Sequence, residues 1–488
     1  MASGSAIVWT DTLAELRAVN GTTSEVAIGI VAGAASSGDG GGGIFRWLVG
    51  TAPTDDNGIR IVPTSQSPNP GYWLRLYSGA VNVLWFGAKR DGSSASAGAN
   101  NTAFSAALNA AAATLGGMAF HSLVTSATGF AHGEVFVPRG HYVLSTVLDV
   151  PGNITIVGEG TFASTLVCTP PDSDAGVSLA NGWIRFTGQT TGRGGGLRNL
   201  MLVWDQATDG PLLVHIDGRS EVRLEGVLIV SNYPGTSSTG TTTLGVRVNS
   251  VTGLVMRDCR LQYCGVQLAG TMSTALLDKV YVNGGYGSGV SKGLEVPAFD
   301  LTGLHIRLTD CVVEYIGQHV AGTMTEQKLG AITVRSGNGS IVGCYFEGCG
   351  GWCIDLGTDR QTVSYNNAHY WIERCVFGGN PGALGVNVGY ARGGGVIDCS
   401  FDAFRYYGGE NPRCVQLRTL QSGETTVGNT GPFNSHNFTV ANNYRGNIVP
   451  QDSSGTLPGY PGTTTRRQAR EHIMLHVGQV RSRRGSEM

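Results

Sequence analysis

The sequence repeats one six-residue pattern, apolar-x-x-apolar-x-apolar, eight times between Leu197 and Phe401. The spacing between copies varies from 21 to 33 residues, which suits a solenoid whose coils share one fixed segment and differ in their loops. Cysteine occupies the fourth position in five copies. The fourth positions are Leu200, Val227, Cys259, Val280, Cys311, Cys344, Cys375 and Cys399.

A shorter pattern, apolar-x-apolar, lies between the copies. Its occurrences are Val214–Ile216, Val246–Val248, Val266–Leu268, Leu294–Val296, Ile332–Val334, Ile354–Leu356, Val386–Val388 and Val415–Leu417. Such short alternation, flanked by Gly, Asn, Asp and Ser, indicates strands. Coils stacked about 4.8 Å apart would bury the apolar positions as inward ladders and pair each strand with the next. The two patterns together predict an all-β chain folded as a parallel β-helix.

Composition supports this fold and narrows the function. The 75 glycines are about twice average usage, and charged residues make up only 14% of the chain. A hydrophobic content of 41% argues against disorder. The net charge of -2 gives no reason to expect a nucleic-acid partner. We therefore expect a large folded domain without nucleic-acid binding.

The chain has 10 cysteines, and five of them fall on one inward ladder position. We expect reduced, buried thiols that pack as small hydrophobic groups. Cys344, Cys349 and Cys353 lie close in sequence, but their spacing fits no standard zinc pattern. The sequence predicts no metal site and no cofactor.

Three regions are expected along the chain. Residues 1–80 contain short aromatic strands and predict a small β-rich module. Residues 81–430 predict the β-helix, preceded by an amphipathic capping helix at about 102–115 with Asn101 as its N-cap. Residues 431–488 form a basic C-terminal cap or tail. The N-terminus shows no secretory signal pattern, and no apolar run reaches membrane-spanning length.

The segments before the repeats carry a family resemblance. Trp85-Phe86-Gly87-Ala88, Asp91-Gly92, the amphipathic helix, Val135 to Tyr142 and Ile154 to Gly160 resemble the start of the pectate-lyase-like, tailspike-type right-handed β-helix proteins. Gly38 to Trp47 and Tyr72 to Leu76 resemble the N-terminal part of phage tailspikes. One difference is that the family usually has acidic residues before the capping helix, where this chain has Asn100 and Asn101.

The resemblance implies a homotrimeric right-handed β-helix that binds, and often cleaves, a bacterial surface or capsular polysaccharide. It also implies a place on a phage tail or injection machine, attached through the N-terminal module, and hence a virion or extracellular location. The family includes glycoside hydrolases, polysaccharide lyases and inactive binders. Fold alone does not choose between these activities.

The repeat predicts where a site would lie. In the six-residue pattern the first, fourth and sixth positions point inward, so the residue after the pattern should point outward. That outward position is occupied by Val203, Val230, Gln262, Asn283, Glu314, Glu347, Gly378 and Asp402. Glu314 and Glu347 are consecutive, which predicts carboxyl groups about 5 to 9 Å apart, the range used by glycosidases. Repulsion between them would raise one pKa and favour acid–base roles.

The middle positions of the second pattern add Asp355, which shares a coil with Glu347. We predict Glu314, Glu347 and Asp355 as catalytic residues. We predict Trp352, Tyr345, Tyr370 and Arg374 as substrate-binding residues, since aromatic and cationic side chains suit a glycan cleft. The alternative for each acid is a solvated surface residue, and for Trp352 a packing role in a turn or a subunit interface.

Three functions remain open from the sequence. The favoured hypothesis is a depolymerase that hydrolyses glycosidic bonds with paired carboxylates. A second is a non-catalytic structural spike or glycan-binding adhesin. A third is a polysaccharide lyase, for which Arg335 and Arg374 would lie near acids that neutralise a uronate.

Overall fold

The computed structural model describes residues 7–21, 27–66, 70–115, 132–169, 182–187, 194–204, 212–231, 244–270, 273–285, 294, 296–316, 330–356, 368–378, 384–388, 391–402, 413–418, 438–441 and 448–451. The chain divides into two compact units. The first comprises residues 1–233 and 243–262, and the second comprises residues 234–242 and 263–488. The predicted boundaries near residues 80 and 430 stay predictions, and most of the basic segment 431–488 lies outside the described residues.

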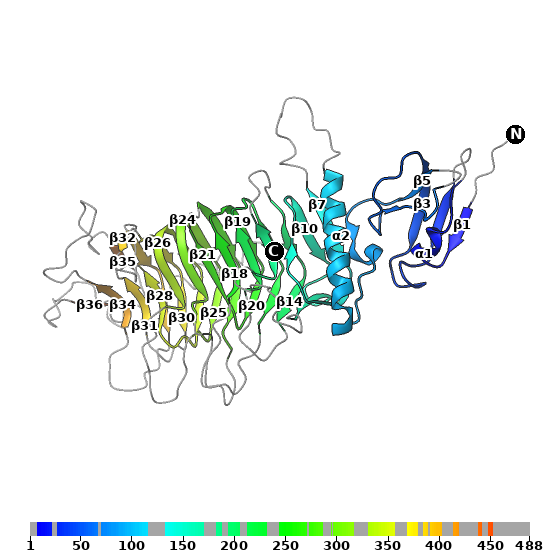
Figure 1. Cartoon of the computed structure of the whole chain (residues 1–488). Coiled ribbons are helices and arrows are strands. Elements are labelled where there is room, and N and C mark those ends of the chain that lie inside the picture. Colours follow the sequence, from blue (N-terminus) through cyan, green and yellow to red (C-terminus); the bar gives the residue numbers. More distant parts are fainter. Residues whose placement is uncertain are drawn as a thin grey trace, which may run out of the picture. The chain divides into compact units, whose positions relative to one another are not determined.

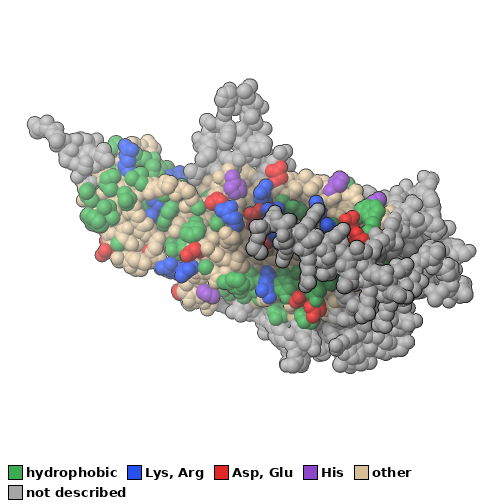
Figure 2. Space-filling model, turned by 180° about the vertical axis from the view of Figure 1, so that it is seen from behind, with side chains coloured by type: hydrophobic (Ala, Val, Ile, Leu, Met, Phe, Trp, Pro, Cys, Tyr) green, Lys and Arg blue, Asp and Glu red, His purple; other side chains and the backbone are tan. Residues whose placement is uncertain are grey.

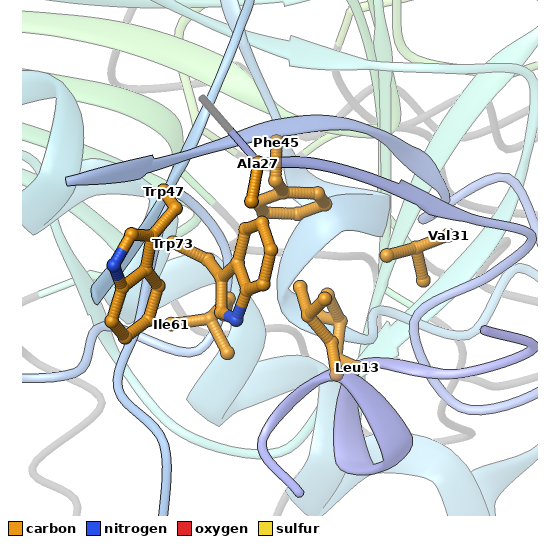
Figure 3. Packing of buried hydrophobic residues seen from close by; sticks show 8 residues of the cluster. Leu13, Ala27, Val31, Phe45, Trp47, Ile61 and Trp73 are labelled. Atoms are coloured by element: carbon orange, nitrogen blue, oxygen red, sulfur yellow. The ribbon is translucent and has the colours of Figure 1, made fainter. Parts of the chain in front are cut away.

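The first unit begins with a small β-sheet module. Its elements are β1 (Ile7–Thr10), α1 (Leu13–Leu16), β2 (Ile28–Val31), β3 (Gly43–Val49), β4 (Arg60–Ile61) and β5 (Gly71–Arg75), with strand order β1-β2-β3-β5-β4. Trp47 and Trp73 pack edge-to-face with ring centroids 5.2 Å apart. Figure 3 shows Phe45 next to the Trp73 ring, Leu13 on the same side of that ring, and Trp47 on its other side. The predicted aromatic strands are confirmed as an antiparallel pair with Trp47 opposite Trp73.

Arg75 explains part of the glycine run in this module. Its guanidinium is buried and donates to the carbonyl oxygens of Gly41, Gly42 and Gly58 at 2.7 to 2.8 Å. A Cβ on Gly41 would lie 2.4 Å from the backbone oxygen of Leu84. The glycines therefore let the backbone approach both the guanidinium and the following segment closely.

A long helix precedes the coils of the first unit. After β6 (Val81–Asn82), η1 (Val83–Phe86) and η2 (Ser94–Ser96), helix α2 runs from Ala97 to Leu115. It is drawn beside β7 in Figure 1. The predicted start at residue 102 was wrong, and Asn101 lies inside the helix. Asn100 is fully buried, accepts the Lys89 N–H at 2.6 Å and donates to the Val143 carbonyl at 3.1 Å. Asn100 thus fastens the helix to the segment before it and to β8 (Gly140–Leu144).

The described coils of the first unit are built from short parallel strands. One set comprises β7 (Gly133–Val137), β9 (Leu148–Asp149), β10 (Ile154–Gly158), β12 (Ile184–Thr187), β13 (Gly196–Arg198), β15 (Val214–Asp217), β16 (Arg223–Glu225), β18 (Leu244–Asn249) and β19 (Thr252–Arg257). The second set comprises β8 (Gly140–Leu144), β11 (Ser164–Cys168), β14 (Met201–Trp204), β17 (Leu228–Val230) and β20 (Arg260–Gln262). All their pairings are parallel, as the repeat predicts.

The second unit continues the same plan. Its first set of strands comprises β21 (Gly265–Ala269), β22 (Thr274–Asp278), β24 (Phe299–Thr309), β26 (Ile332–Val342), β28 (Trp352–Leu356), β29 (Ala368–Glu373), β31 (Leu384–Val388), β32 (Ala391–Ile397), β34 (Arg413–Arg418), β35 (Phe438–Ala441) and β36 (Ile448–Gln451). The other set, which we call the outer-site sheet, comprises β23 (Tyr281–Asn283), β25 (Val312–Glu314), β27 (Tyr345–Glu347), β30 (Val376–Gly378) and β33 (Ser400–Asp402). The predicted parallel β-helix is confirmed.

The six-residue pattern spans a bend between two strands. Its third residue takes a positive φ of 51° to 67° in every copy, at Asn199, Gly226, Asp258, Lys279, Asp310, Gly343, Arg374 and Asp398. The apolar residues of the pattern are buried on either side of this bend. A left-handed residue at a fixed position turns the chain in the same way in each copy of the pattern.

The ladder cysteines are free and buried, which confirms the expected thiols for the nine described cysteines. Each of three thiols in the second unit donates to the backbone carbonyl of the first pattern residue one coil earlier. These bonds join Cys311 to Leu277, Cys375 to Ile341 and Cys399 to Ile372 at 3.4 to 3.7 Å. Cysteine therefore fills a small apolar position and also satisfies a carbonyl near the bend.

The interior also contains an aromatic stack. Phe346, Phe377 and Phe401 occupy the sixth pattern position on three consecutive coils, with ring centroids 4.9 and 4.6 Å apart and nearly parallel planes.

Among the described residues, no helix is long and apolar enough to cross a membrane.

One strand prediction was wrong. Leu294 forms an isolated bridge with Ile316, Glu295 lies outside the described residues, and the strand that pairs with β21 and β26 begins at Phe299. Asp300, rather than Glu295, therefore stands between Gln267 and Thr333 in the register.

Candidate functional site

Glu314 and Glu347 face each other on neighbouring strands of the outer-site sheet. β25 and β27 pair in parallel with Glu314 opposite Glu347. Both side chains are half-buried, while Val313 and Phe346 beside them point into the core. The structure therefore places the two residues next to each other on the outer surface, on strands about 4.8 Å apart.

Asn283 precedes Glu314 in the same outward position, and Tyr281 lies two residues before it. The Tyr281 hydroxyl donates to Glu314 Oε2 at 2.6 Å. The Asn283 side-chain amide donates to Tyr281 Oη at 2.7 Å and to Glu314 Oε2 at 3.2 Å. Sequence reasoning placed Asn283 in the outward position but missed Tyr281. The signal was its position one residue before the inward Val282, where the alternation of a strand also points outward.

Tyr345 lies in the same sheet as the two acids. Its hydroxyl donates to Glu347 Oε2 at 2.8 Å. This hydrogen bond, with burial and the nearby charges of Glu347 and Glu314, raises the pKa of Tyr345 to about 12. Tyr345 therefore keeps its proton at neutral pH and acts as a donor to Glu347. The predicted role of Tyr345 in substrate binding stays a prediction.

Asp355 lies in the other sheet of the unit. It is opposite Thr333 and Asn387 in the register and is only 2% exposed. Asn387 Nδ2 donates to Asp355 Oδ1 at 2.9 Å, and burial raises the pKa of Asp355 to about 6. The turn at Gly348–Gly351 separates Asp355 from Glu347 in the chain. No hydrogen bond joins Asp355 to Glu314 or Glu347.

Asp300 was missed by sequence reasoning. It is 5% exposed and receives two hydrogen bonds from the Arg335 guanidinium, at 2.7 and 3.0 Å. Gln267 Nε2 donates to the same carboxylate at 3.1 Å. Arg335 is therefore engaged in an ion pair rather than positioned as a base.

Among the described residues, no hydrogen bond or ion pair joins the other predicted binding residues to the acidic pair. Trp352 is half-buried at the start of β28. Tyr370 is fully buried among the inward residues of β29, so we leave it out of the proposed site. Arg374 is exposed at the bend before β30, two residues before Val376, the register partner of Tyr345.

Charge and metal-binding groups are dispersed in the described parts of the chain. Figure 2 shows acidic and basic side chains interspersed on one face, without a continuous patch of one sign. Within the described ranges, no group of three or more His, Cys, Asp or Glu side chains is placed to hold a metal ion.

Two family models match consecutive parts of the chain. Residues 10–78 match the phage tail protein small four-stranded beta-sheet domain, and residues 80–293 match the rhamnogalacturonase A/epimerase, pectate lyase-like family. These matches confirm the resemblance of the N-terminal module to phage tail proteins and of the coils to pectate-lyase-like proteins. No curated protein matches the chain.

The chain is also similar to solved structures. The tailspike protein of Acinetobacter baumannii phage AM24 has a TM-score of 0.50 and 15% identity, over 83% of this chain and 63% of that one. A glycan biofilm modifying enzyme of Pantoea stewartii, with a tailspike-like parallel beta-helix fold, has a TM-score of 0.47 and 12% identity, over 78% of this chain and 48% of that one. The chain thus spans less than two thirds of each. At such low identity, the first of these structures supports the fold alone.

Proposed function

We propose that this protein is a tailspike-like component of a phage tail that binds a bacterial surface or capsular polysaccharide and hydrolyses its glycosidic bonds. The observation that carries the proposal is the Glu314–Glu347 pair, which lies in register on an outer sheet of a tailspike-type β-helix. Two carboxyl groups on one surface are the catalytic requirement of most glycoside hydrolases. The match of residues 10–78 supports attachment to a tail through the N-terminal module.

The assignment of Glu314 and Glu347 follows from their exposure and pairing. Both are half-buried and therefore within reach of a polymer, whereas Asp355 is 2% exposed. We keep Asp355 as a secondary candidate, because a pKa of about 6 suits a general acid. Hydrolysis is favoured over a lyase reaction because Arg335 is held by Asp300.

The test is depolymerisation of a panel of bacterial capsular and surface polysaccharides by the full chain. Cleavage is measured as new reducing ends and loss of viscosity. Glu314→Gln and Glu347→Gln are each expected to lower the cleavage rate by about 100-fold or more, with polysaccharide binding retained. Glu373→Gln, a carboxylate of the same unit outside the pair, is the matched control and keeps the wild-type rate.

The outcomes separate the three functions. Polysaccharide binding without new reducing ends would assign the chain to the non-catalytic spikes. Products with the ultraviolet absorbance of an unsaturated uronate would assign it to the lyases. Equal rates for wild type and both Gln variants would remove the carboxylate pair from the reaction.

A further inference from the structure

The contacts of Asn283 fix the direction of a short chain of hydrogen bonds. The Gly285 backbone N–H donates to Asn283 Oδ1 at 2.7 Å. A backbone N–H can only donate, so the carbonyl side of the Asn283 amide must face Gly285. The amide NH₂ therefore faces Tyr281 and Glu314, in agreement with its contacts at 2.7 and 3.2 Å.

The direction continues through Tyr281. Its oxygen receives an N–H from Asn283, so its own proton points to Glu314 Oε2, 2.6 Å away. Glu314 Oε2 thus accepts two hydrogen bonds. In the described part of the structure, no donor reaches Oε1. The result is a carboxylate whose negative charge is stabilised on one oxygen and whose other oxygen is left for chemistry.

Glu347 has a simpler environment. Its carboxylate accepts one hydrogen bond from the described residues, from the Tyr345 hydroxyl at 2.8 Å, and Glu347 is opposite Gly378 on the side away from Glu314. The carboxylate of Glu314 therefore receives two hydrogen bonds from described side chains, and that of Glu347 receives one. The two acids differ because each has a different register partner on the preceding strand. The partner of Glu314 is Asn283, and the partner of Glu347 is Glu314.

We propose that Tyr281 is a positioning residue that, with Asn283, holds Glu314 as the nucleophile of a retaining glycoside hydrolase, and that Glu347 is its acid–base partner. The assignment rests on the proposed function. Because Glu314 and Glu347 are register partners on adjacent strands about 4.8 Å apart, their carboxyl groups can reach the separation of about 5 to 5.5 Å that retaining enzymes use. Inverting enzymes need a wider gap for a water molecule.

The reaction then has two balanced steps. Glu314 Oε1 forms a bond to the anomeric carbon while the glycosidic bond breaks, and Glu347 gives its proton to the departing sugar oxygen. Water next attacks the anomeric carbon, loses a proton to Glu347 and releases Glu314 as a carboxylate. The two inversions leave the product with the configuration of the substrate.

The first experiment needs no catalysis. The full chain is labelled with a water-soluble carbodiimide and glycine ethyl ester, and the labelling of each carboxyl group is measured by peptide mass spectrometry. Tyr281→Phe is expected to raise the labelling of Glu314 at least 2-fold and to leave Glu347 unchanged, because the lost hydroxyl donates to Glu314 and not to Glu347. Tyr345→Phe is the matched variant and should raise the labelling of Glu347 alone. Equal effects of both variants on both acids would overturn the positioning role.

The second experiment uses a polysaccharide that the wild-type chain cleaves. Tyr281→Phe is expected to lower kcat about 10-fold with KM unchanged. Proton NMR of the first product should show retained anomeric configuration. With sodium azide, Glu314→Ala should yield a glycosyl azide of inverted configuration, and Glu347→Ala one of retained configuration. An inverted hydrolysis product, or the reverse azide pattern, would overturn the role assignment. If no polysaccharide is cleaved, the proposed function fails, and the labelling still decides the positioning role of Tyr281.

Discussion

The burial of Asp355 predicts how the stability of the folded protein depends on pH. Its carboxyl group is 2% exposed, and burial raises its pKa from 3.8 to about 6. Each pKa unit corresponds to about 1.4 kcal/mol, so ionised Asp355 costs the folded state about 3 kcal/mol relative to the unfolded chain. Asn387 donates to Oδ1 and offsets only part of the desolvation. Asp355→Asn removes the ionisation and keeps an oxygen that can accept this bond.

The direction of this pH effect follows from proton binding at Asp355 in the folded and the unfolded chain. Between about pH 4 and pH 6 the folded chain retains a proton at Asp355 that the unfolded chain has released. The stability of the wild-type protein therefore falls across this window relative to Asp355→Asn. The variant is expected to match the wild type near pH 3.5 and to be more stable by about 3 kcal/mol at pH 7.

The assay is denaturant unfolding followed by circular dichroism, with both proteins measured from pH 3.5 to pH 8. The difference in unfolding free energy between the two proteins reports the ionisation of Asp355, because all other groups titrate in both proteins. Asp300→Asn is a control of opposite sign. It leaves the Arg335 guanidinium without its carboxylate and should lower stability at pH 7. A difference for Asp355→Asn that stays constant with pH, or that favours the wild type at pH 7, would refute the reasoning.

Two further substitutions test the core and the helix attachment. Phe377→Ala removes the middle ring of the stack with Phe346 and Phe401 and should cost about 3–5 kcal/mol in denaturant unfolding, whereas Phe377→Leu should cost less. Asn100→Ala leaves the Lys89 N–H and the Val143 carbonyl without their side-chain partner. Each unpaired group should lower the stability of the fold by about 1–3 kcal/mol, measured as a loss of amide-exchange protection in helix α2. A change within experimental error in either case would contradict the contact that motivates it.

The sequence predicts the inward positions well because the two strand patterns are local. The register of the outer-site sheet places Glu314 opposite Glu347, as the six-residue pattern requires. The apolar-x-apolar pattern is weaker, since both Leu294–Val296 and Phe299–Leu301 satisfy it. Pairing with Val266 on one side and Ile332 on the other selects Phe299, and this information is not local.

Side-chain partners were harder to predict than strand positions. Asn100 looked like part of a helix start, but its amide bonds join segments 11 and 43 residues away in the sequence. Tyr370 looked like a surface aromatic, yet it falls on the inward side of β29. The contact between Tyr281 and Glu314 depends on a diagonal across two strands, which the sequence pattern of one strand does not contain.

The left-handed bend in each six-residue pattern has an evolutionary consequence. Because the bend and the inward ladder set the path of each coil, a change at an outward residue alters surface chemistry and leaves the backbone in place. Outward residues on neighbouring strands form a grid with a fixed spacing of about 4.8 Å. A new arrangement of acids, amides and phenols can therefore arise by single substitutions on this grid, and recognition of a different polymer need not disturb folding.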